Sequence, residues 1–317
     1  MPISKPSLSL AHSADADDVF MWWPITGKVD PRDPSRVLAP PCLDTGRFAY
    51  RSIPDDIQQL NQRAIAAADL DITAISIFNY TRCAKAYALT ACGWSFGDGF
   101  GPKLVVRVDA AGQPEFSVAS LRSRRIAVPG LQTTAFLTLS LMVGPGTFQP
   151  VPMPFDKIVP SVASGRVAAG DTPLDAGLLI HESQLDHHKH GLTTIADVGA
   201  WWKASTGLPL PLGGNALRRA LEVEHGPGTL AHIAGVLESS IAHALAHRAE
   251  SMAYARTFSP QLSDADLDRY ITMYVSPLTL APGLAGKHAA ERLFAAGAAA
   301  GLCAAPGPID LVTGPTR

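Results

Sequence analysis

The sequence predicts a two-lobed α/β protein, and three observations support this prediction. The chain of 317 residues is longer than one ordinary α/β core and suits two lobes or one large domain. Short apolar runs typical of strands alternate with segments of helical periodicity, as in α/β proteins. Two extended segments, 103–108 and 208–215, stand where the chain would cross to a second lobe and back. We therefore expect residues 1–106 and 211–317 in one lobe and residues 107–210 in the other.

Composition narrows the classes of partner. Hydrophobic residues make up 47% of the chain, charged residues 17%, and the formal net charge is -2. These values indicate a soluble globular protein without the basic surplus that nucleic-acid binding requires. The four cysteines form no CxxC pair, and residues 1–16 contain no apolar core of a signal peptide. We expect a cytoplasmic chain that binds a small molecule, with no nucleic-acid or membrane partner. A homodimer is left open.

The periodicity assigns elements along the whole chain. In the first part we expect a strand at 8–11, a helix from Val19 to about Gly27, a helix over 57–68 with Ile57, Leu60, Ala64 and Ile65 on one face, a strand over 71–76 and a helix over about 80–89. In the middle we expect strands at 125–128 and 177–180 and helices at 135–143, 155–163 and 198–205. In the last third we expect helices at 217–223, 229–255, 264–275 and 287–300.

His181 follows the short apolar strand at 177–180. Ligands of open α/β sheets bind outside the carboxyl ends of the strands, and histidine exchanges protons near neutral pH. The alternative is a structural histidine tied to the backbone. Other polar segments at strand ends favour a catalytic base. If His181 faces the ligand, strand alternation predicts that Ile180 and Glu182 face away.

Polar side chains also follow two strands of the first lobe. Asp15, Asp17 and Asp18 come after the first strand, and Ser76 and Asn79 stand at the turn after the strand 71–76. Capping of the following helix accounts for at least one aspartate, and it is also the alternative for Ser76 and Asn79. Three carboxylates in four positions exceed what capping requires. We therefore expect ligand contacts here, with Asp15 and Asp17 near ligand hydroxyls.

Thr133 and Thr134 follow a Pro-Gly pair and begin the apolar helix 135–143. A helix that is apolar all round is buried, so the backbone N–H groups at its start need partners inside the protein. The same geometry binds a carboxylate or phosphate. Capping of the helix explains one of the two threonines. The presence of a second one at the same helix start favours an anion-binding site there.

Two further stretches invite readings that we set aside. The glycine-rich segment 93–101 lacks the Lys-Ser/Thr of a phosphate-binding loop, which leaves a mobile loop or hinge. His187, His188 and His190 suggest zinc, but adjacent histidines cannot readily share one tetrahedral centre. No carboxylate or thiol stands at metal spacing beside them, so a polar surface turn is simpler. We predict no metal site.

Six blocks, taken in order and spacing, resemble the 1,4-dihydroxy-6-naphthoate synthase family of the futalosine route to menaquinone. They are His12-Ser-Ala-Asp-Ala-Asp-Asp-Val-Phe-Met21, Asp71-Ile-Thr-Ala-Ile-Ser76, Gly97-Asp-Gly-Phe-Gly-Pro102, Pro129-Gly130 with Thr133-Thr-Ala135, Ala176-Gly-Leu-Leu-Ile-His-Glu182, and Trp201-Trp202 through Leu208-Pro-Leu-Pro-Leu-Gly-Gly-Asn215.

The resemblance implies a fold like that of type II periplasmic binding proteins, with the active site between the lobes. It matches His181 to the family's catalytic base. It matches Ala74, Ser76 and Asn79, together with Thr133, Thr134 and Ala135, to segments that contact substrate. The implied reaction is cleavage of a carbon–carbon bond in cyclic dehypoxanthine futalosine, without a cofactor. The chain departs from the family at the longer loop 165–173, at Asn79, and at Ser276 and Ala281, which leaves the exact substrate open. The sibling chorismate dehydratase and a non-catalytic solute-binding protein are the alternatives.

Overall fold

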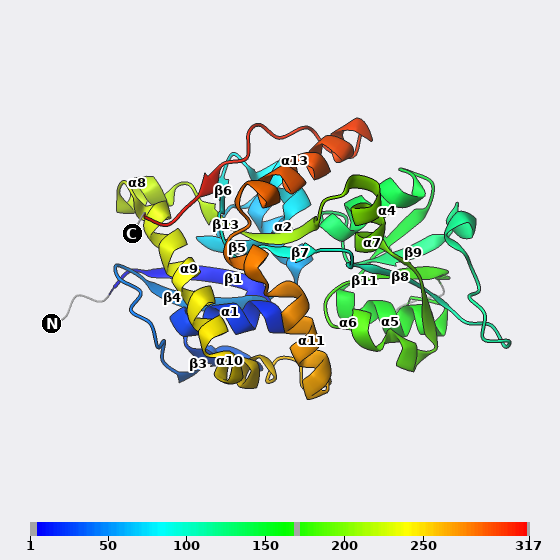
Figure 1. Cartoon of the computed structure of the whole chain (residues 1–317), viewed down its shortest axis with the longest axis horizontal. Coiled ribbons are helices and arrows are strands. Elements are labelled where there is room, and N and C mark those ends of the chain that lie inside the picture. Colours follow the sequence, from blue (N-terminus) through cyan, green and yellow to red (C-terminus); the bar gives the residue numbers. More distant parts are fainter. Residues whose placement is uncertain (1–4, 168–171, 316–317) are drawn as a thin grey trace. The chain divides into compact units, whose positions relative to one another are not determined.

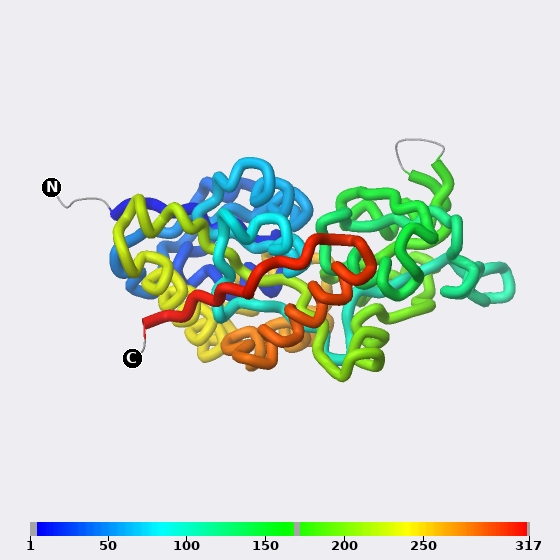
Figure 2. The backbone as a smooth tube through the Cα atoms, turned by 90° about the horizontal axis from the view of Figure 1, so that it is seen from above, coloured from blue at the N-terminus to red at the C-terminus, as the bar shows by residue number. Residues whose placement is uncertain are grey.

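The computed structural model describes residues 5–167 and 172–315, and these residues form two compact units. Unit 1 contains the described residues up to Ser95, residues 213–287 and the segment from Pro306 onward. Unit 2 contains residues 96–212 and 288–305. Residues 96–106 and 288–305, which the sequence predicts in the first lobe, belong to unit 2 instead. Both ends of the described chain belong to unit 1 (Figure 2).

Unit 1 is built on a seven-stranded mixed sheet (Figure 1). β1 is parallel to both β4 and β5, whereas β13 is antiparallel to β5 and β6. The strands, in spatial order, are β14 (Leu311–Val312), β6 (Tyr87–Thr90), β13 (Leu210–Arg218), β5 (Ile72–Ser76), β1 (Ser7–Ser13) and β4 (Ala49–Asp55), with β7 (Ser95–Gly97) also paired to β13.

The three parallel strands of unit 1 end at one edge of the sheet. Ser13 pairs with Asp55, and Ala11 pairs with Thr73. β5 is buried along its whole length, as expected of a strand covered on both faces. The polar residues that follow β1 and β5 in the sequence are therefore brought to the same edge.

Helices cover this sheet, and α1 is the most deeply buried of them: ten of its eleven residues are buried. Val19 and Trp23 of α1 pack with Tyr254 of α10. A two-stranded ribbon of β2 (Lys28–Asp30) and β3 (Asp33–Ala39) follows α1. The helices are α1 (Ala16–Thr26), α2 (Ile57–Ala66), α3 (Tyr80–Cys83), α8 (Leu221–His225), α9 (Thr229–Ala246), α10 (Arg248–Ala255), α11 (Asp264–Tyr274) and α12 (Pro277–Leu280), and α13 (Gly283–Ala299) begins in unit 1 and continues into unit 2.

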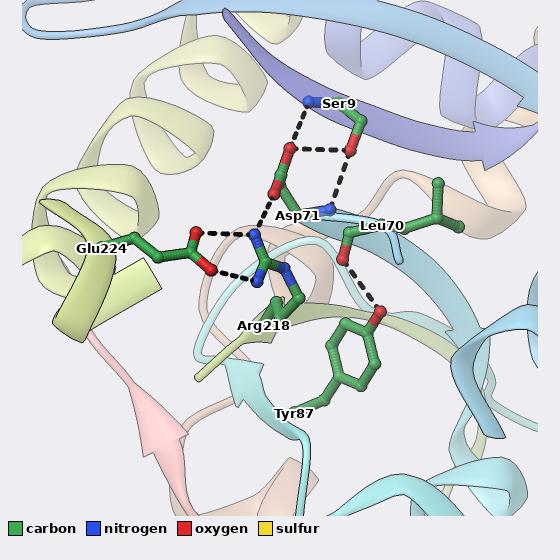
Figure 3. Close-up of polar contacts among 6 residues, drawn as sticks. All are labelled: Ser9, Leu70, Asp71, Tyr87, Arg218 and Glu224. Carbon is green, nitrogen blue, oxygen red and sulfur yellow. Dashed lines mark hydrogen bonds and ion pairs between the residues drawn. The ribbon is translucent and has the colours of Figure 1, made fainter. Parts of the chain in front are cut away.

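An ion network ties strands together at the amino end of β5 (Figure 3). Arg218 donates to Asp71 at 2.7 Å and holds Glu224 through two nitrogens at 2.6 and 2.8 Å. Asp71 in turn accepts from the backbone N–H and the hydroxyl of Ser9, both at 2.9 Å. The network joins β1, the start of β5 and the end of β13. It lies away from the edge where β1 and β5 terminate.

Unit 2 has a five-stranded sheet, which, like that of unit 1, contains both parallel and antiparallel strand pairs. β9 is parallel to β10 and β11, and β8 is antiparallel to β11 and β12. One core cluster, centred on Leu104, Val128 and Leu178, covers one side, and another contains Val105, Ile158 and Val162. In spatial order the strands are β10 (Gln149–Pro152), β9 (Arg125–Val128), β11 (Ala176–Leu179), β8 (Lys103–Arg107) and β12 (Leu192–Asp197).

Glycines allow close packing at two places in unit 2. A Cβ on Gly177 would stand 2.7 Å from Val162 and 2.8 Å from Ile158, so the glycine lets α5 approach β11. A Cβ on Gly199 would stand 2.0 Å from the carbonyl oxygen of Phe100. The glycine-rich stretch 93–101, which the sequence suggested as a mobile loop or hinge, contains strand β7. Its last residues, Phe100 and Gly101, form a turn that packs against Gly199 of α7. The elements of this unit are the helices α4 (Thr134–Val143), α5 (Phe155–Ser164), α6 (Ser183–Asp186) and α7 (Val198–Thr206), with short 3-10 turns η2 (Val118–Leu121) and η3 (His187–His190).

Three helices expected from the sequence are wrong in part. The segment 80–89 forms the single turn α3 and then strand β6, because Ala88 and Leu89 pair with β13. The helix expected at 217–223 begins only at Leu221, because Leu217 and Arg218 end β13. The continuous helix expected over 229–255 is interrupted at His247, which has φ -111° and ψ 44°. Tertiary pairing overrides local propensity in the first two cases.

The loop 165–173, singled out as long, is described only at its two ends. Arg166 bridges Pro173, and Leu174 N donates to Gly165 O at 2.9 Å. Residues 168–171 lie outside the described residues. Within the described part of the chain, no helix has the length and apolar character needed to cross a bilayer.

Candidate active site

The first group of predicted residues lies in unit 1 around the start of α1. Asp15 occupies the N-cap position of α1 in an extended conformation without a side-chain cap hydrogen bond, and Asp15 and Asp17 are 4% and 7% exposed. The hydroxyl of Tyr270, from α11, lies 3.2 Å from Asp15 Oδ2 and 3.1 Å from Asp17 Oδ1. One phenol proton can be donated to only one of these carboxylates at a time. The pair therefore retains capacity to accept hydrogen bonds from ligand hydroxyls.

Asp18 has a different role from its two neighbours. Its carboxylate accepts from the backbone N–H of Ser13 at 2.7 Å and from the indole of Trp22 at 3.3 Å. It thus holds the loop between β1 and α1. Asp17 and Asp18 both lie in the first turn of α1, where the helix dipole favours a negative charge, but neither of these bonds of Asp18 caps the helix.

Ser76 and Asn79 are held by Asn61 of α2. Asn61 donates to Ser76 Oγ at 3.0 Å and accepts from Ser76 N at 2.9 Å. Asn79 Nδ2 donates to the carbonyl of Asn61 at 3.0 Å. Neither Ser76 nor Asn79 caps a helix with its side chain, so the capping alternative is wrong for both.

Asn79 keeps one unused acceptor. The residue is fully buried, and its Oδ1 meets no hydrogen-bond partner within the described part of the chain. A buried amide oxygen in this state costs free energy unless a ligand or water satisfies it. Ala74 lies two residues earlier than Ser76 on β5 and pairs with Asn215 of β13. These residues together form a polar end to β5.

His12 lies close to this group and is 2% exposed. Its Nδ1 donates to Ser13 O, and its Nε2 accepts from Ser52 Oγ, both at 2.7 Å. Burial lowers the pKa of His12 from its ordinary value of 6.5, against smaller raising effects of the Ser13 hydrogen bond and the Asp15 charge. The imidazole is therefore neutral in the folded protein at neutral pH.

We expect the free energy of unfolding to fall as the pH drops below about 6.5, because the unfolded chain then binds protons that folded His12 does not. Each such histidine contributes a slope of up to ~1.4 kcal/mol per pH unit. Urea unfolding at pH 7.5 and 5.5 measures the slope. His12→Gln should reduce it and His190→Gln, at an exposed position, should not. An unchanged slope in His12→Gln would contradict the assignment.

The second group lies in unit 2 at the start of α4. Thr133 caps the helix: its hydroxyl accepts from Phe136 N at 3.2 Å and donates to Gly130 O at 2.8 Å. Thr134 Oγ1 donates to Leu212 O at 2.8 Å. Both hydroxyls thus serve the protein itself, which corrects the expectation that a threonine hydroxyl is kept for an anion. The first backbone N–H groups of a helix such as α4, here those of Thr134 and Ala135, point out of its start and are the kind of donor that suits a carboxylate.

His181 also belongs to unit 2 and follows β11, the strand beside the one that precedes this helix. β9 and β11 are parallel neighbours, with Gly177 paired to Ala127, so both strands lead to the same edge. His181 is half-buried, and its ring meets that of Phe155 edge-on at 4.6 Å. The structure therefore places Thr133, Thr134, Ala135 and His181 together in unit 2.

The conformation of His181 differs from the expected strand. β11 ends at Leu179, and His181 has φ +55°, in the left-handed region. The alternation rule that assigned Ile180 and Glu182 to the opposite face therefore does not apply. A turn, and not a strand, directs this imidazole.

The histidine-rich segment forms a short turn, η3, which is exposed as expected of a surface turn except at His187. His187 is 8% exposed and bonds Gln184 O and Thr194 Oγ1, while His188 and His190 are exposed. Within residues 5–167 and 172–315, no group of three His, Cys, Asp or Glu side chains is arranged to hold a metal.

Sequence comparison places this geometry in a known family. A family model described as "Menaquinone biosynthesis" matches residues 8–299. A 1,4-dihydroxy-6-naphthoate synthase from Thermus thermophilus is 35% identical over 306 residues, which cover 96% of this chain and 98% of that protein. A second one, from Streptomyces coelicolor, is 32% identical over 310 residues, with the same two shares covered.

Solved structures agree with this placement. A protein of Archaeoglobus fulgidus superimposes with a TM-score of 0.76 at 36% identity, covering 93% of this chain and 98% of that one. The alkanesulfonate-binding protein SsuA from Xanthomonas axonopodis superimposes with a TM-score of 0.64 at 13% identity, covering 97% of each chain. The second likeness concerns the fold alone and confirms the predicted periplasmic-binding-protein-like α/β class. By sequence and by fold, the chain belongs to the menaquinone biosynthesis family.

Proposed function

We propose that this protein is a lyase that cleaves a carbon–carbon bond of cyclic dehypoxanthine futalosine and releases 1,4-dihydroxy-6-naphthoate, with His181 as general base. The observation that supports this most directly is the position of His181. It follows β11, whose parallel neighbour β9 leads to α4, so the same edge of the unit 2 sheet carries a candidate proton acceptor and a helix start of the kind that binds anions. The names of the two relatives supply the substrate class.

The proposed step is of the retro-aldol type. His181 takes the proton of a substrate hydroxyl, and the oxygen forms a carbonyl as the neighbouring carbon–carbon bond breaks. The electron pair of that bond passes into the departing ring system, which recovers a proton and becomes aromatic. General-base catalysis of this kind contributes about 10²–10⁴-fold, and the aromatic product supplies driving force.

The other residues bind the substrate in this proposal. The carboxylate of the naphthoate portion would be held by the backbone N–H groups of Thr134 and Ala135. Asp15 and Asp17 would accept hydrogen bonds from the hydroxyls of the sugar-derived portion, and Asn79 Oδ1 would accept another. Tyr270, which the sequence did not single out, would hold the two carboxylates in place.

Incubation of the purified protein with cyclic dehypoxanthine futalosine, followed by mass detection of dihydroxynaphthoate, tests the proposal. Chorismate, supplied in a parallel reaction, tests the sibling dehydratase activity. Product from cyclic dehypoxanthine futalosine alone supports the proposed lyase. Saturable binding without product would instead favour a solute-binding protein.

Tyr270→Phe is expected to raise KM by roughly 10-fold with little change in kcat, because hydrogen bonds to charged groups are worth about 1.5–3 kcal/mol. Steady-state kinetics measure both constants. Tyr50→Phe is a matched control, since Tyr50 is also buried and its hydroxyl has no hydrogen-bond partner in the described structure. An unchanged KM in Tyr270→Phe would contradict the proposal that Asp15 and Asp17, held by Tyr270, bind the substrate.

A further inference from the structure

The turn after β11 holds His181 in a conformation that an L-residue seldom adopts. A φ of +55° costs about 1–2 kcal/mol for a residue with a side chain. Among the described residues, Ala68 and Ser123 are the other non-glycine residues at positive φ. Such a conformation persists only where surrounding contacts hold it. In this turn the contacts are hydrogen bonds to the backbone carbonyls of Ile180 and His181.

Gln184 makes two of these contacts, both to His181 itself. Its backbone N–H and its side-chain Nε2 both donate to the carbonyl oxygen of His181, at 3.3 and 3.1 Å. Gln184 is 5% exposed, so its amide is held inside the protein. Fixing this carbonyl fixes the peptide plane after His181, and with it the direction in which the imidazole leaves the backbone. Ser183 holds the preceding carbonyl, of Ile180, at 2.6 Å.

His187 anchors Gln184 to the sheet. Its Nδ1 lies 3.1 Å from the carbonyl of Gln184, and its Nε2 lies 2.9 Å from Thr194 Oγ1 on β12. A carbonyl only accepts, so Nδ1 carries the proton, and the neutral ring accepts from Thr194 at Nε2. Burial, with the charges of His188 and Lys103, lowers the pKa of His187, in keeping with a neutral ring. Hydrogen bonds thus lead from Thr194 through His187 and Gln184 to His181.

We infer that Gln184, anchored by His187 and Thr194, is a positioning residue for the base His181. This inference rests on the proposed function, since it assigns Gln184 an effect on proton removal. Gln184 acts through the conformation of His181 and needs no substrate contact. The histidine-rich segment that resembled a metal site then supports the catalytic turn.

Gln184→Met keeps the length of the side chain and removes its N–H donor. We expect kcat to fall by about 10-fold with KM within about twofold, since small misplacements of a catalytic group cost up to about 10²-fold. Thr194→Val, which breaks the link farthest from His181, should lower kcat less. Thr206→Val is the matched control: it removes a comparable side-chain bond to a carbonyl, from Thr206 Oγ1 to Trp202 O at 2.8 Å, elsewhere in unit 2. It should leave both constants unchanged.

A double-mutant cycle shows whether Gln184 raises kcat by positioning His181 or makes a contribution to kcat of its own. If Gln184 acts through His181, Gln184→Met should cause no further loss in a His181→Asn protein. An equal fall in both backgrounds would overturn the inference, as would an unchanged kcat in Gln184→Met. If His181→Asn itself left kcat unaltered, the proposed base would be wrong instead.

A spectroscopic readout tests the positioning without turnover. The ring protons of His181 lie near the face or edge of Phe155 and should show its ring-current shift by NMR. The His181 signals are assigned by their loss in His181→Asn. Gln184→Met should move these signals, and Thr206→Val should not. Unmoved signals in Gln184→Met would overturn the inference even if the enzyme proposal stood.

Discussion

His181→Asn is expected to lower kcat by roughly 10²-fold or more while KM changes far less. Asparagine keeps a similar size and some hydrogen bonding, and it tolerates the left-handed backbone better than most residues, so the turn at φ +55° should survive. The change removes the proton acceptor. Because a protonated imidazole cannot act as a base, the parent should also lose activity in acid. The variant should lack that dependence.

His188→Asn is the control for this experiment, since His188 is an exposed histidine in the same segment. Its kcat and KM should match the parent. A His181→Asn protein with near-normal kcat and a greatly raised KM would make His181 a binding residue. The base would then be sought among Asp15, Asp17 and Asp18.

Arg218→Met is expected to lower the free energy of unfolding by about 2–4 kcal/mol, because breaking a buried ion pair leaves its partner uncompensated. Arg218 and Asp71 are 19% and 18% exposed, so the loss should fall short of that for a fully buried pair. The hydrogen bonds to Glu224 and Asp71 raise the pKa of Arg218, which keeps it charged. Urea unfolding followed by circular dichroism measures the change.

Arg63→Met provides the comparison for Arg218→Met. Arg63 pairs with Asp69 at 2.7 Å, but the two side chains are 37% and 46% exposed. Exposed pairs contribute about 0–1 kcal/mol, so this variant should be nearly as stable as the parent. Equal effects of the two substitutions would show that burial of the Arg218 network matters little. Neither change should alter kcat, because the network lies at the amino end of β5.

The positions of the site residues were largely predictable because they follow strands. Two parallel neighbours bring their carboxyl ends to one edge, so polar residues after β1 and β5, and after β9 and β11, are gathered by topology alone. The hydrogen-bond partners of the individual side chains could not be predicted from the sequence in the same way. Thr134 bonds Leu212 and Ser76 bonds Asn61, and both partners come from other elements.

The position of Asn61 in the sequence could have indicated its role in the site. It falls on the buried face of α2 with Ile57 and Leu60, whereas Ile65, assigned to that face, is 40% exposed. A polar residue on an apolar face indicates a buried partner. Tyr270 had no local signal, since its partner Asp15 lies 255 residues earlier.

The strand β6 shows where periodicity fails. Tyr80 to Leu89 reads as a helix, yet Tyr87 donates to Leu70 O at 2.8 Å and the strand pairs on both sides. Short apolar runs are ambiguous between helix and strand, and distant pairing decides. The positive φ of His181 was equally hidden, because a run of apolar residues before it continues the strand pattern.

The strand order of unit 1 has a consequence for synthesis on the ribosome. β13 pairs with β5 and β6, yet it begins at Leu210, after every strand of the second sheet has been made. Until it emerges, β5 and β6 each present an unpaired edge, which is a site for misassociation. The strands of the second sheet all lie between Lys103 and Asp197 and can pair first. A chain that ended just before Leu210 and had left the ribosome would therefore contain every strand of the second sheet and an incomplete first sheet, exposed to such misassociation.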